Sequence, residues 1–239
     1  MKAIILAAGK GTRMNSDLPK VVLKVNGKCL INWVLDLAKQ VGAEESIVVI
    51  GYKGEEVKKC LQGCDCEFVW QKEQLGTGHA VMMAKEKLFD YNGDVLILYG
   101  DVPALTEKTV NKLISVHKES DAVVTILTAE LDNPGSYGRM LRKDGKVIGI
   151  KEAKDASEEE LMIKEFNSGI YIVDNNLLLY ALDLLKNDNK QEEYYLTDIV
   201  EIAHAEGKKI SAYITSNADE VEGVNTIEQL DKMEQILGK

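Results

Sequence analysis

Short apolar runs recur along the first half of the chain, and segments with apolar residues at helical spacing lie between them. The runs cover residues 3–6, 46–50, 66–70, 94–99 and 122–128. Consecutive apolar positions of this length are typical of strands that are buried on both faces. Amphipathic helices are predicted between the runs, at 30–38, 55–61, 80–88 and 106–117. The alternation predicts an α/β fold with a mostly parallel sheet and helices on both of its faces.

Shorter extended segments follow residue 133. Asn26-Gly27 and Asp144-Gly145 are turn signals, and the second separates two such segments, which indicates a β-hairpin. Ser157 and Glu160 form a capping-box pattern that predicts a charged helix. The remaining predicted elements are a strand at 166–173, helices at 177–185 and 196–205, a strand at 210–214 and a helix at 226–237. We find no repeat or linker, which favours one domain, residues 1–225, with an inserted lobe around 130–195.

The loop at residues 6–20 is the most distinctive segment. It holds Gly9 and Gly11 together with the cations Lys10, Arg13 and Lys20. Glycine lets backbone N–H groups approach a ligand, and the cations neutralise phosphate oxygens, so the loop suits a triphosphate. It fits neither the dinucleotide fingerprint nor the P-loop pattern. An ordinary turn with solvated cations is the alternative, and the additional Pro19-Lys20 pair favours phosphate binding.

Loops at 8–20, 71–77 and 99–101 each follow a predicted strand. Ligands bind beyond the carboxyl ends of the strands in open α/β sheets, so we expect these loops to share one rim. Asp101 directly follows the most apolar strand, and Gly100 leaves room beside it. The Asp101 carboxylate is therefore a candidate Mg²⁺ ligand, although an Asp that opens the turn before Pro103 is the alternative.

Charge and composition narrow the classes of partner. The formal net charge of −10 argues against a duplex nucleic acid or an anionic membrane as partner. The N-terminal apolar run is too short for a signal peptide, so we expect a cytoplasmic protein with reduced thiols. Cys60, Cys64 and Cys66 lack a second ligand pair at zinc spacing, and a zinc site there is a minor alternative. The three histidines are scattered singly and receive no assigned role.

Residues 6–14, Leu-Ala-Ala-Gly-Lys-Gly-Thr-Arg-Met, with Leu18-Pro19-Lys20, resemble the signature of the sugar nucleotidyltransferases. The resemblance runs essentially end to end. It is strongest to the uridylyltransferase domains of bifunctional N-acetylglucosamine-1-phosphate uridyltransferases. It implies the Rossmann-like nucleotidyltransferase fold, a substrate-side lobe around 130–195 and a C-terminal linking helix at 226–239.

The resemblance also implies an activity. UMP would pass from UTP to N-acetylglucosamine-1-phosphate, giving UDP-N-acetylglucosamine for cell wall peptidoglycan and releasing pyrophosphate, with Mg²⁺ as cofactor. The attacking phosphate oxygen is already ionised near neutral pH because the second pKa of a phosphate monoester is about 6. No side-chain base is then required, which agrees with the absence of a Ser/His/Asp or Cys/His set in the sequence.

Site residues are implied in the same way. Arg13 and Lys20 would be catalytic, and Asp101 and Asn225 would hold the metal. The implied contacts with uracil are Gln71, Gly76, Thr77 and the backbone of Leu6, Ala7, Ala8 and Gly9. Those with the sugar are Gly138, Glu152, Asn167 and Thr197, and Tyr99 and Gly100 adjoin Asp101 in the substrate-binding set.

One departure concerns the β-helix acetyltransferase domain of the bifunctional enzymes: the sequence ends at Gly238-Lys239, just after the implied linking helix, and we expect this domain to be absent. We therefore expect no acetyl transfer, and a monomer or weak dimer. Two other functions stay open. One is nucleotidyl transfer to another sugar phosphate or alcohol phosphate, and the other is a regulatory module that binds nucleotide or sugar without turnover.

Overall fold

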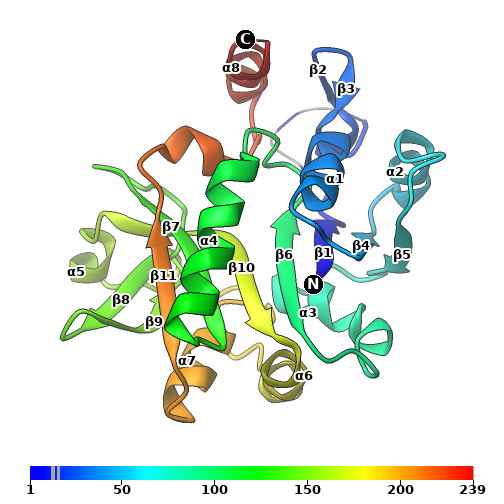
Figure 1. The fold of residues 1–239 in the computed structure, drawn as a ribbon. Coiled ribbons are helices and arrows are strands. Elements are labelled where there is room, and N and C mark those ends of the chain that lie inside the picture. The colour runs from blue at the N-terminus through cyan, green and yellow to red at the C-terminus, as the bar shows by residue number, and fades with distance from the viewer. Residues whose placement is uncertain (12–13, 15–16, 239) are drawn as a thin grey trace.

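A mixed sheet flanked by helices forms the centre of the molecule (Figure 1). The computed structural model describes residues 1–11, 14 and 17–238. Its strands are β1 (Lys2–Ala7), β2 (Lys24–Val25), β3 (Lys28–Cys29), β4 (Glu45–Ile50), β5 (Glu67–Trp70), β6 (Asp94–Tyr99), β7 (Val124–Glu130), β8 (Arg139–Lys143), β9 (Lys146–Lys151), β10 (Glu165–Asp174) and β11 (Ile210–Ile214). Its helices are α1 (Leu30–Gln40), α2 (Gly54–Cys60), α3 (Thr77–Met82), α4 (Glu107–Ser120), α5 (Glu158–Leu161), α6 (Asn175–Leu184), α7 (Asp198–Ala205) and α8 (Ile227–Leu237).

The central sheet runs in the order β11-β7-β10-β6-β1-β4-β5, and β8 and β9 extend it from β10. Strands β6, β1, β4 and β5 are parallel, as are β11 and β7. Only β10 runs antiparallel to both of its neighbours on this path within the described residues. The predicted fold class, a mostly parallel mixed sheet with helices, is confirmed.

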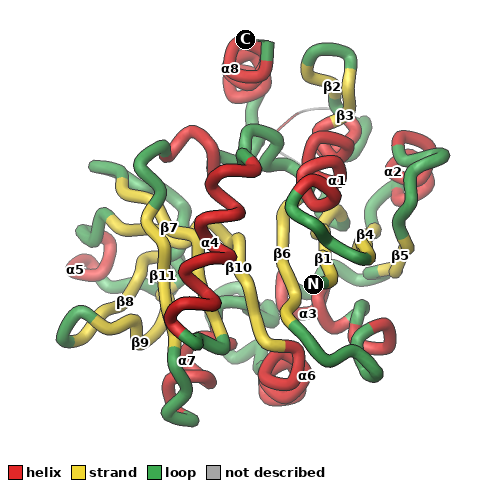
Figure 2. The backbone as a smooth tube through the Cα atoms, viewed as in Figure 1, coloured by secondary structure: helices red, strands yellow, loops and turns green. Residues whose placement is uncertain are grey.

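Each face of the sheet is covered by its own group of helices (Figure 2). Along β1, Ile5 packs into the core beneath α1 and α4, whereas Ile4 packs into the core beneath α3, α6 and α7. Both isoleucines are fully buried. Alternate residues of a strand point to opposite faces, so a strand between two helical layers must be apolar at every position. This is the physical reason for the uninterrupted apolar runs.

The turn signals Asn26-Gly27 and Asp144-Gly145 are both confirmed, since each lies between two paired strands. Asn26 and Gly27 take φ values of +51° and +79° between β2 and β3, and Asp144 and Gly145 take +51° and +76° between β8 and β9. These left-handed values match the right-handed twist of the paired strands. The capping box of Ser157 and Glu160 is also present.

One helix prediction was wrong in extent. The helix predicted over 80–88 ends at Met82, and a 3₁₀ turn at Lys85–Lys87 follows. Ala84 and Leu88 are still buried, but the chain carries them there through hydrogen bonds between residues three apart. The charged helix predicted after Ser157 is present as α5, a single turn that buries no residue, and the chain then returns to the sheet at β10.

The carboxyl ends of β1, β5 and β6 open on the same edge of the sheet, where α8 also lies (Figure 1). The loops after these strands are the ones that the sequence places on a shared rim. None of the described helices has the length and apolar character that crossing a membrane requires.

Candidate active site

Lys20, Asp101 and Asn225 meet at this edge. Lys20 opens a 3₁₀ turn at Lys20–Val22, Asp101 follows β6, and Asn225 lies just before α8. The Lys20 ammonium forms a close ion pair with Oδ2 of Asp101 and donates a 2.8 Å hydrogen bond to Oδ1 of Asn225. These partners are 81 and 205 positions away from Lys20 in the sequence. The Asp101 side chain is only 10% exposed, which shields the pair from water.

Two glycines permit this approach. Gly11 has a φ of +61°, and a Cβ atom there would lie 3.0 Å from Cβ of Lys20. A Cβ atom on Gly223 would lie 3.0 Å from Oδ2 of Asp101. The backbone N–H of Val224 also donates to the Asp101 carbonyl oxygen at 2.9 Å. The segment before α8 is thus fixed against the end of β6.

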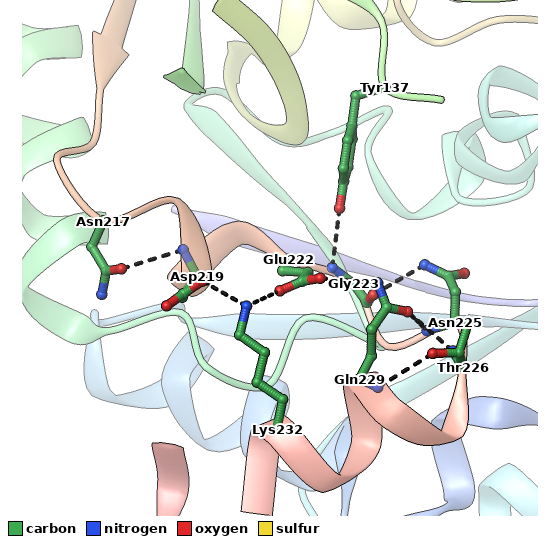
Figure 3. Close-up of polar contacts among 9 residues, drawn as sticks. All are labelled: Tyr137, Asn217, Asp219, Glu222, Gly223, Asn225, Thr226, Gln229 and Lys232. Atoms are coloured by element: carbon green, nitrogen blue, oxygen red, sulfur yellow. Dashed lines mark hydrogen bonds and ion pairs between the residues drawn. The ribbon is translucent and has the colours of Figure 1, made fainter. Parts of the chain in front are cut away.

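The orientation of the Asn225 side chain is set by its neighbours (Figure 3). Its amide nitrogen donates to the Gly223 carbonyl oxygen at 3.0 Å, so its amide oxygen faces Lys20. Its backbone N–H donates to Oε1 of Gln229 at 2.7 Å, and the N–H of Gly223 donates to the Tyr137 hydroxyl at 3.3 Å. Thr226 and Gln229 form the capping box that starts α8. The residue that caps α8 is therefore Thr226, next to Asn225.

A cavity of about 360 Å³ opens on one side of the Lys20 cluster. It lies between the end of β6, the residues that flank the β8–β9 hairpin, and the start of α8. Polar groups from eight separate segments face it. They include Lys20, Thr77, Tyr99, Asp101, Ser136, Tyr137, Gly138, Glu152, Asn167, Ser168, Gly169, Thr197, Gly223, Asn225 and Gln229.

A second cavity, of about 240 Å³, opens on the other side. It lies over the carboxyl ends of β1 and β5 and the start of α3. Its lining comprises Leu6, Ala7, Ala8, Gly9, Lys20, Val21, Gln71, Gln74, Gly76, Thr77, Ala80, Tyr99, Asp101 and Glu193. Lys20, Thr77, Tyr99 and Asp101 line both cavities, so the two halves meet at the cation and carboxylate.

Hydrogen bonds order the polar groups of the larger cavity. Oε1 of Glu152 accepts a 3.1 Å hydrogen bond from the Thr197 hydroxyl. Burial raises the pKa of the Glu152 carboxyl above its ordinary value. Oδ1 of Asn167 accepts from the N–H of Gly169 at 2.9 Å, and the N–H of Asn167 donates to the Gly138 carbonyl oxygen at 2.9 Å. The four implied sugar contacts are therefore linked in two pairs, Glu152 with Thr197 through their side chains and Asn167 with Gly138 through the backbone.

Tyr99 forms the wall that the two cavities share. Burial raises the pKa of its hydroxyl well above the ordinary value, so the side chain stays neutral. A Cβ atom on Gly169 would lie 2.6 Å from Cε2 of Tyr99, and the φ of Gly169 is +86°. Only glycine fits beside this ring.

The structure brings most of the implied site residues to these two cavities. Gly100 is the described residue that lines neither of them. Its N–H donates to the Leu6 carbonyl oxygen at 2.9 Å and so continues the pairing of β6 with β1. Arg13 lies outside the described residues.

Several lining residues were not singled out from the sequence. Tyr137, Ser168 and Gln229 in the larger cavity, and Gln74 and Glu193 in the smaller one, belong to this group. Gln74 lies inside a loop already assigned to the rim, which was an available signal. Glu193 is brought to the site by a distant segment, and no local pattern marks it.

The donor set beside Lys20 suits a hard divalent cation. A carboxylate oxygen and an amide oxygen both face the Lys20 ammonium, which is itself a cation. Mg²⁺ prefers oxygen ligands of this kind and shares itself with substrate phosphates. Among the residues that the structure describes, no three His, Cys, Asp or Glu side chains form a metal cluster. Burial, then contact with Cys29, raises the pKa of the Cys60 thiol to about 12, which disfavours the thiolate that zinc requires.

Replacing Gly76 with alanine is expected to destabilise the fold by roughly 1–3 kcal/mol. Gly76 has a φ of +108°, and a Cβ atom would lie 2.6 Å from the Tyr194 carbonyl oxygen. Gly42→Ala is the matched control, because Gly42 also has a positive φ, of +82°, but open space around it. Urea unfolding measures the free energy of unfolding of both variants. Equal losses of stability in the two variants would show that the contact with Tyr194 is unimportant.

Comparison with known proteins defines the class. Residues 3–158 match the family described as MobA-like NTP transferase domain, and the chain belongs to this family. The fold resembles that of a solved UDP-glucose pyrophosphorylase complexed with UDP-glucose, with a TM-score of 0.77, 18% sequence identity, and coverage of 99% of this chain and 98% of that one.

More similar relatives carry the name bifunctional protein GlmU. The protein of that name from Alkaliphilus metalliredigens is 47% identical over 238 residues, which is 99% of this chain and 52% of the relative. The one from Clostridioides difficile is 46% identical over 237 residues, 99% of this chain and 51% of the relative. The chain thus spans about half the length of these relatives, their N-terminal half. The resemblance drawn from the N-terminal loop is confirmed.

Proposed function

We propose that this chain transfers UMP from UTP to N-acetylglucosamine-1-phosphate, forming UDP-N-acetylglucosamine and pyrophosphate. The observation that carries the proposal is the position of Lys20 and Asp101, which line both cavities at once. A reaction between a nucleotide and a sugar phosphate needs its phosphates to meet at such a junction. The similarity to proteins named bifunctional protein GlmU supports the choice of substrates.

UTP would bind in the smaller cavity. Its base would lie near Gln71, Gly76 and Thr77, and its phosphates would reach toward Lys20 past the backbone that follows β1. Lys20 holds a positive charge in a protected position, where charge stabilisation is stronger than in water. Arg13 would add a second positive charge.

N-acetylglucosamine-1-phosphate would bind in the larger cavity. Glu152 and Asn167 offer acceptors and donors to the sugar hydroxyls and the acetamido group, and Gly138 lets the backbone approach. The sugar phosphate would then lie next to Asp101 and Lys20.

The reaction forms a bond between an oxygen of the sugar phosphate and the α-phosphorus of UTP. The bond from this phosphorus to the bridging oxygen of the β-phosphate breaks, and pyrophosphate leaves with its electron pair. The attacking oxygen is ionised near neutral pH, so no residue has to remove a proton. Catalysis then comes from positioning and from stabilisation of charge by Lys20 and Arg13.

Asp101 and Asn225 would hold the divalent cation, because both present an oxygen to the point that the Lys20 ammonium occupies, and the cation would take the place of this ammonium there. When bound, Mg²⁺ supplies charge neutralisation at the phosphate oxygens of the two substrates. The residues around the site keep these ligands oriented: Gly223 fixes the Asn225 amide, and Val224 anchors the backbone of Asp101.

A pyrophosphate-release assay tests the proposal. Each of the four nucleoside triphosphates is paired with several sugar-1-phosphates in the presence of Mg²⁺. We expect UTP with N-acetylglucosamine-1-phosphate to give the highest kcat/KM, with UDP-N-acetylglucosamine identified as the product. A higher value for another pair would assign the chain to that substrate class, and release with no pair would favour a binding module.

Replacing Glu152 with alanine is expected to raise the KM for N-acetylglucosamine-1-phosphate by about tenfold to a hundredfold, because hydrogen bonds to charged groups contribute roughly 1.5–3 kcal/mol. The KM for UTP should change less than about threefold, since Glu152 lines the larger of the two cavities and not the smaller one. Steady-state kinetics with each substrate varied in turn measures both values. Glu158→Ala, at an exposed position on α5, is the control. A rise confined to the KM for UTP would place the sugar elsewhere.

A further inference from the structure

The Gln71 side chain has a fixed orientation at the end of β5. It is 3% exposed, and its amide nitrogen lies 3.0 Å from the Gly76 carbonyl oxygen and 3.1 Å from Nδ1 of His79. A carbonyl oxygen can only accept, so the amide nitrogen must be the atom that faces Gly76. The second amide proton then points to His79, which makes Nδ1 an acceptor and assigns the ring proton to Nε2 from the hydrogen-bond pattern.

This arrangement leaves the Gln71 amide oxygen for a ligand. Both amide protons are already used, and none of the described residues donates a hydrogen bond to the oxygen. Gln71 lines the smaller cavity. An acceptor presented there can receive a hydrogen bond from N3–H of uracil. It repels N3 of cytosine, because that atom is itself an acceptor.

We propose that His79 is a positioning residue that holds the Gln71 amide with its oxygen toward the base, and thereby favours uracil over cytosine. The proposal rests on the proposed function, because it takes the smaller cavity as the nucleotide site. His79 acts through Gln71: together with the Gly76 carbonyl oxygen it accepts from the amide nitrogen, and this second contact further opposes rotation of the amide.

Contacts with neighbouring segments hold His79 in place. It is the third residue of α3, and its ring lies 6.2 Å from the ring of Tyr194. The N–H of Gly78 donates to the Tyr194 carbonyl oxygen, and the N–H of Tyr194 donates to the Leu75 carbonyl oxygen, each at 2.8 Å. The loop before α3 and the segment around Tyr194 therefore hold the imidazole in place beside Gln71.

Two variants distinguish the role of Nδ1 as a hydrogen-bond acceptor from the packing of the His79 ring. His79→Phe keeps a ring that packs against Tyr194 but removes the acceptor, whereas His79→Asn places an amide oxygen close to the position of Nδ1. Calorimetric titration with Mg-UTP and with Mg-CTP, without sugar phosphate, measures binding alone. We expect His79→Phe to weaken UTP binding about fivefold and to change CTP binding less than twofold. His79→Asn should restore UTP binding to within about twofold of the wild type.

Equal losses for UTP and CTP in His79→Phe, or a His79→Asn variant no better than His79→Phe, would overturn the proposal. So would a wild type that binds CTP as tightly as UTP. Should His79→Phe not unfold cooperatively on heating, His79→Gln replaces it, because its amide reaches the position of Nε2 and not that of Nδ1. Transfer activity is measured separately, so absence of pyrophosphate release with an intact UTP preference contradicts the proposed function alone.

Discussion

Replacing Asp101 with alanine is expected to lower turnover by roughly 10²–10³-fold at a fixed concentration of Mg²⁺. The variant loses the carboxylate that lines both cavities and, in the proposed mechanism, one of the two ligands of the cation. Fold stability should change less than activity, because Asp101 lies at the rim of the sheet and its backbone hydrogen bond with Val224 remains. Steady-state pyrophosphate release and urea unfolding measure the two effects.

Asp132→Ala is the control for Asp101→Ala. Asp132 also pairs with a lysine, Lys164, but its side chain is 96% exposed and lines neither cavity. We expect wild-type rates from this control. A comparable rate in Asp101→Ala would remove Asp101 from the mechanism.

Lys20→Met is expected to reduce kcat by roughly 10²-fold while leaving the affinity for N-acetylglucosamine-1-phosphate within about threefold. Methionine keeps much of the length of the side chain and removes its charge, which lies at the junction of the two cavities. The negative charge that Lys20 would stabilise develops as the bond to the α-phosphorus forms. Loss of the ammonium should therefore slow the chemical step. Single-turnover kinetics measures that step, and equilibrium binding measures the affinity.

Lys28→Met provides the matched comparison for Lys20→Met. Lys28 also pairs with an aspartate, Asp36, but at a partly exposed position that lines neither cavity. The Lys28→Met variant should retain the wild-type kcat. A Lys20→Met variant that changes only sugar affinity would show that Lys20 has a binding role and no role in the chemical step.

The sequence predicted the sheet because the physics of a buried strand is local. Ile4 and Ile5 must both be apolar when helices cover both faces, and that requirement is visible in the order of residues. The direction of a strand is not visible in this way. Strand β10 looks like any other buried strand in composition, yet it runs antiparallel to both neighbours, because its direction depends on the chain that leads into it.

The candidate site was predictable to a similar degree. Asp101 could be found from its place after an apolar strand, and the shared rim followed from the rule for ligand sites in α/β sheets. The contact of Lys20 with Asn225 could not, because it joins residues 205 positions apart. His79 was assigned no role, since its contact with Gln71 depends on where α3 begins relative to β5.

A crystal structure of the chain with UDP-N-acetylglucosamine and Mn²⁺ tests the central claim most directly. Mn²⁺ is used because its anomalous scattering locates the cation. We predict the uracil ring against Gln71, the acetamido sugar against Glu152 and Asn167, and the cation peak beside Asp101 and Asn225. A nucleotide sugar bound outside these two cavities, or a cation peak away from Asp101, would contradict the account.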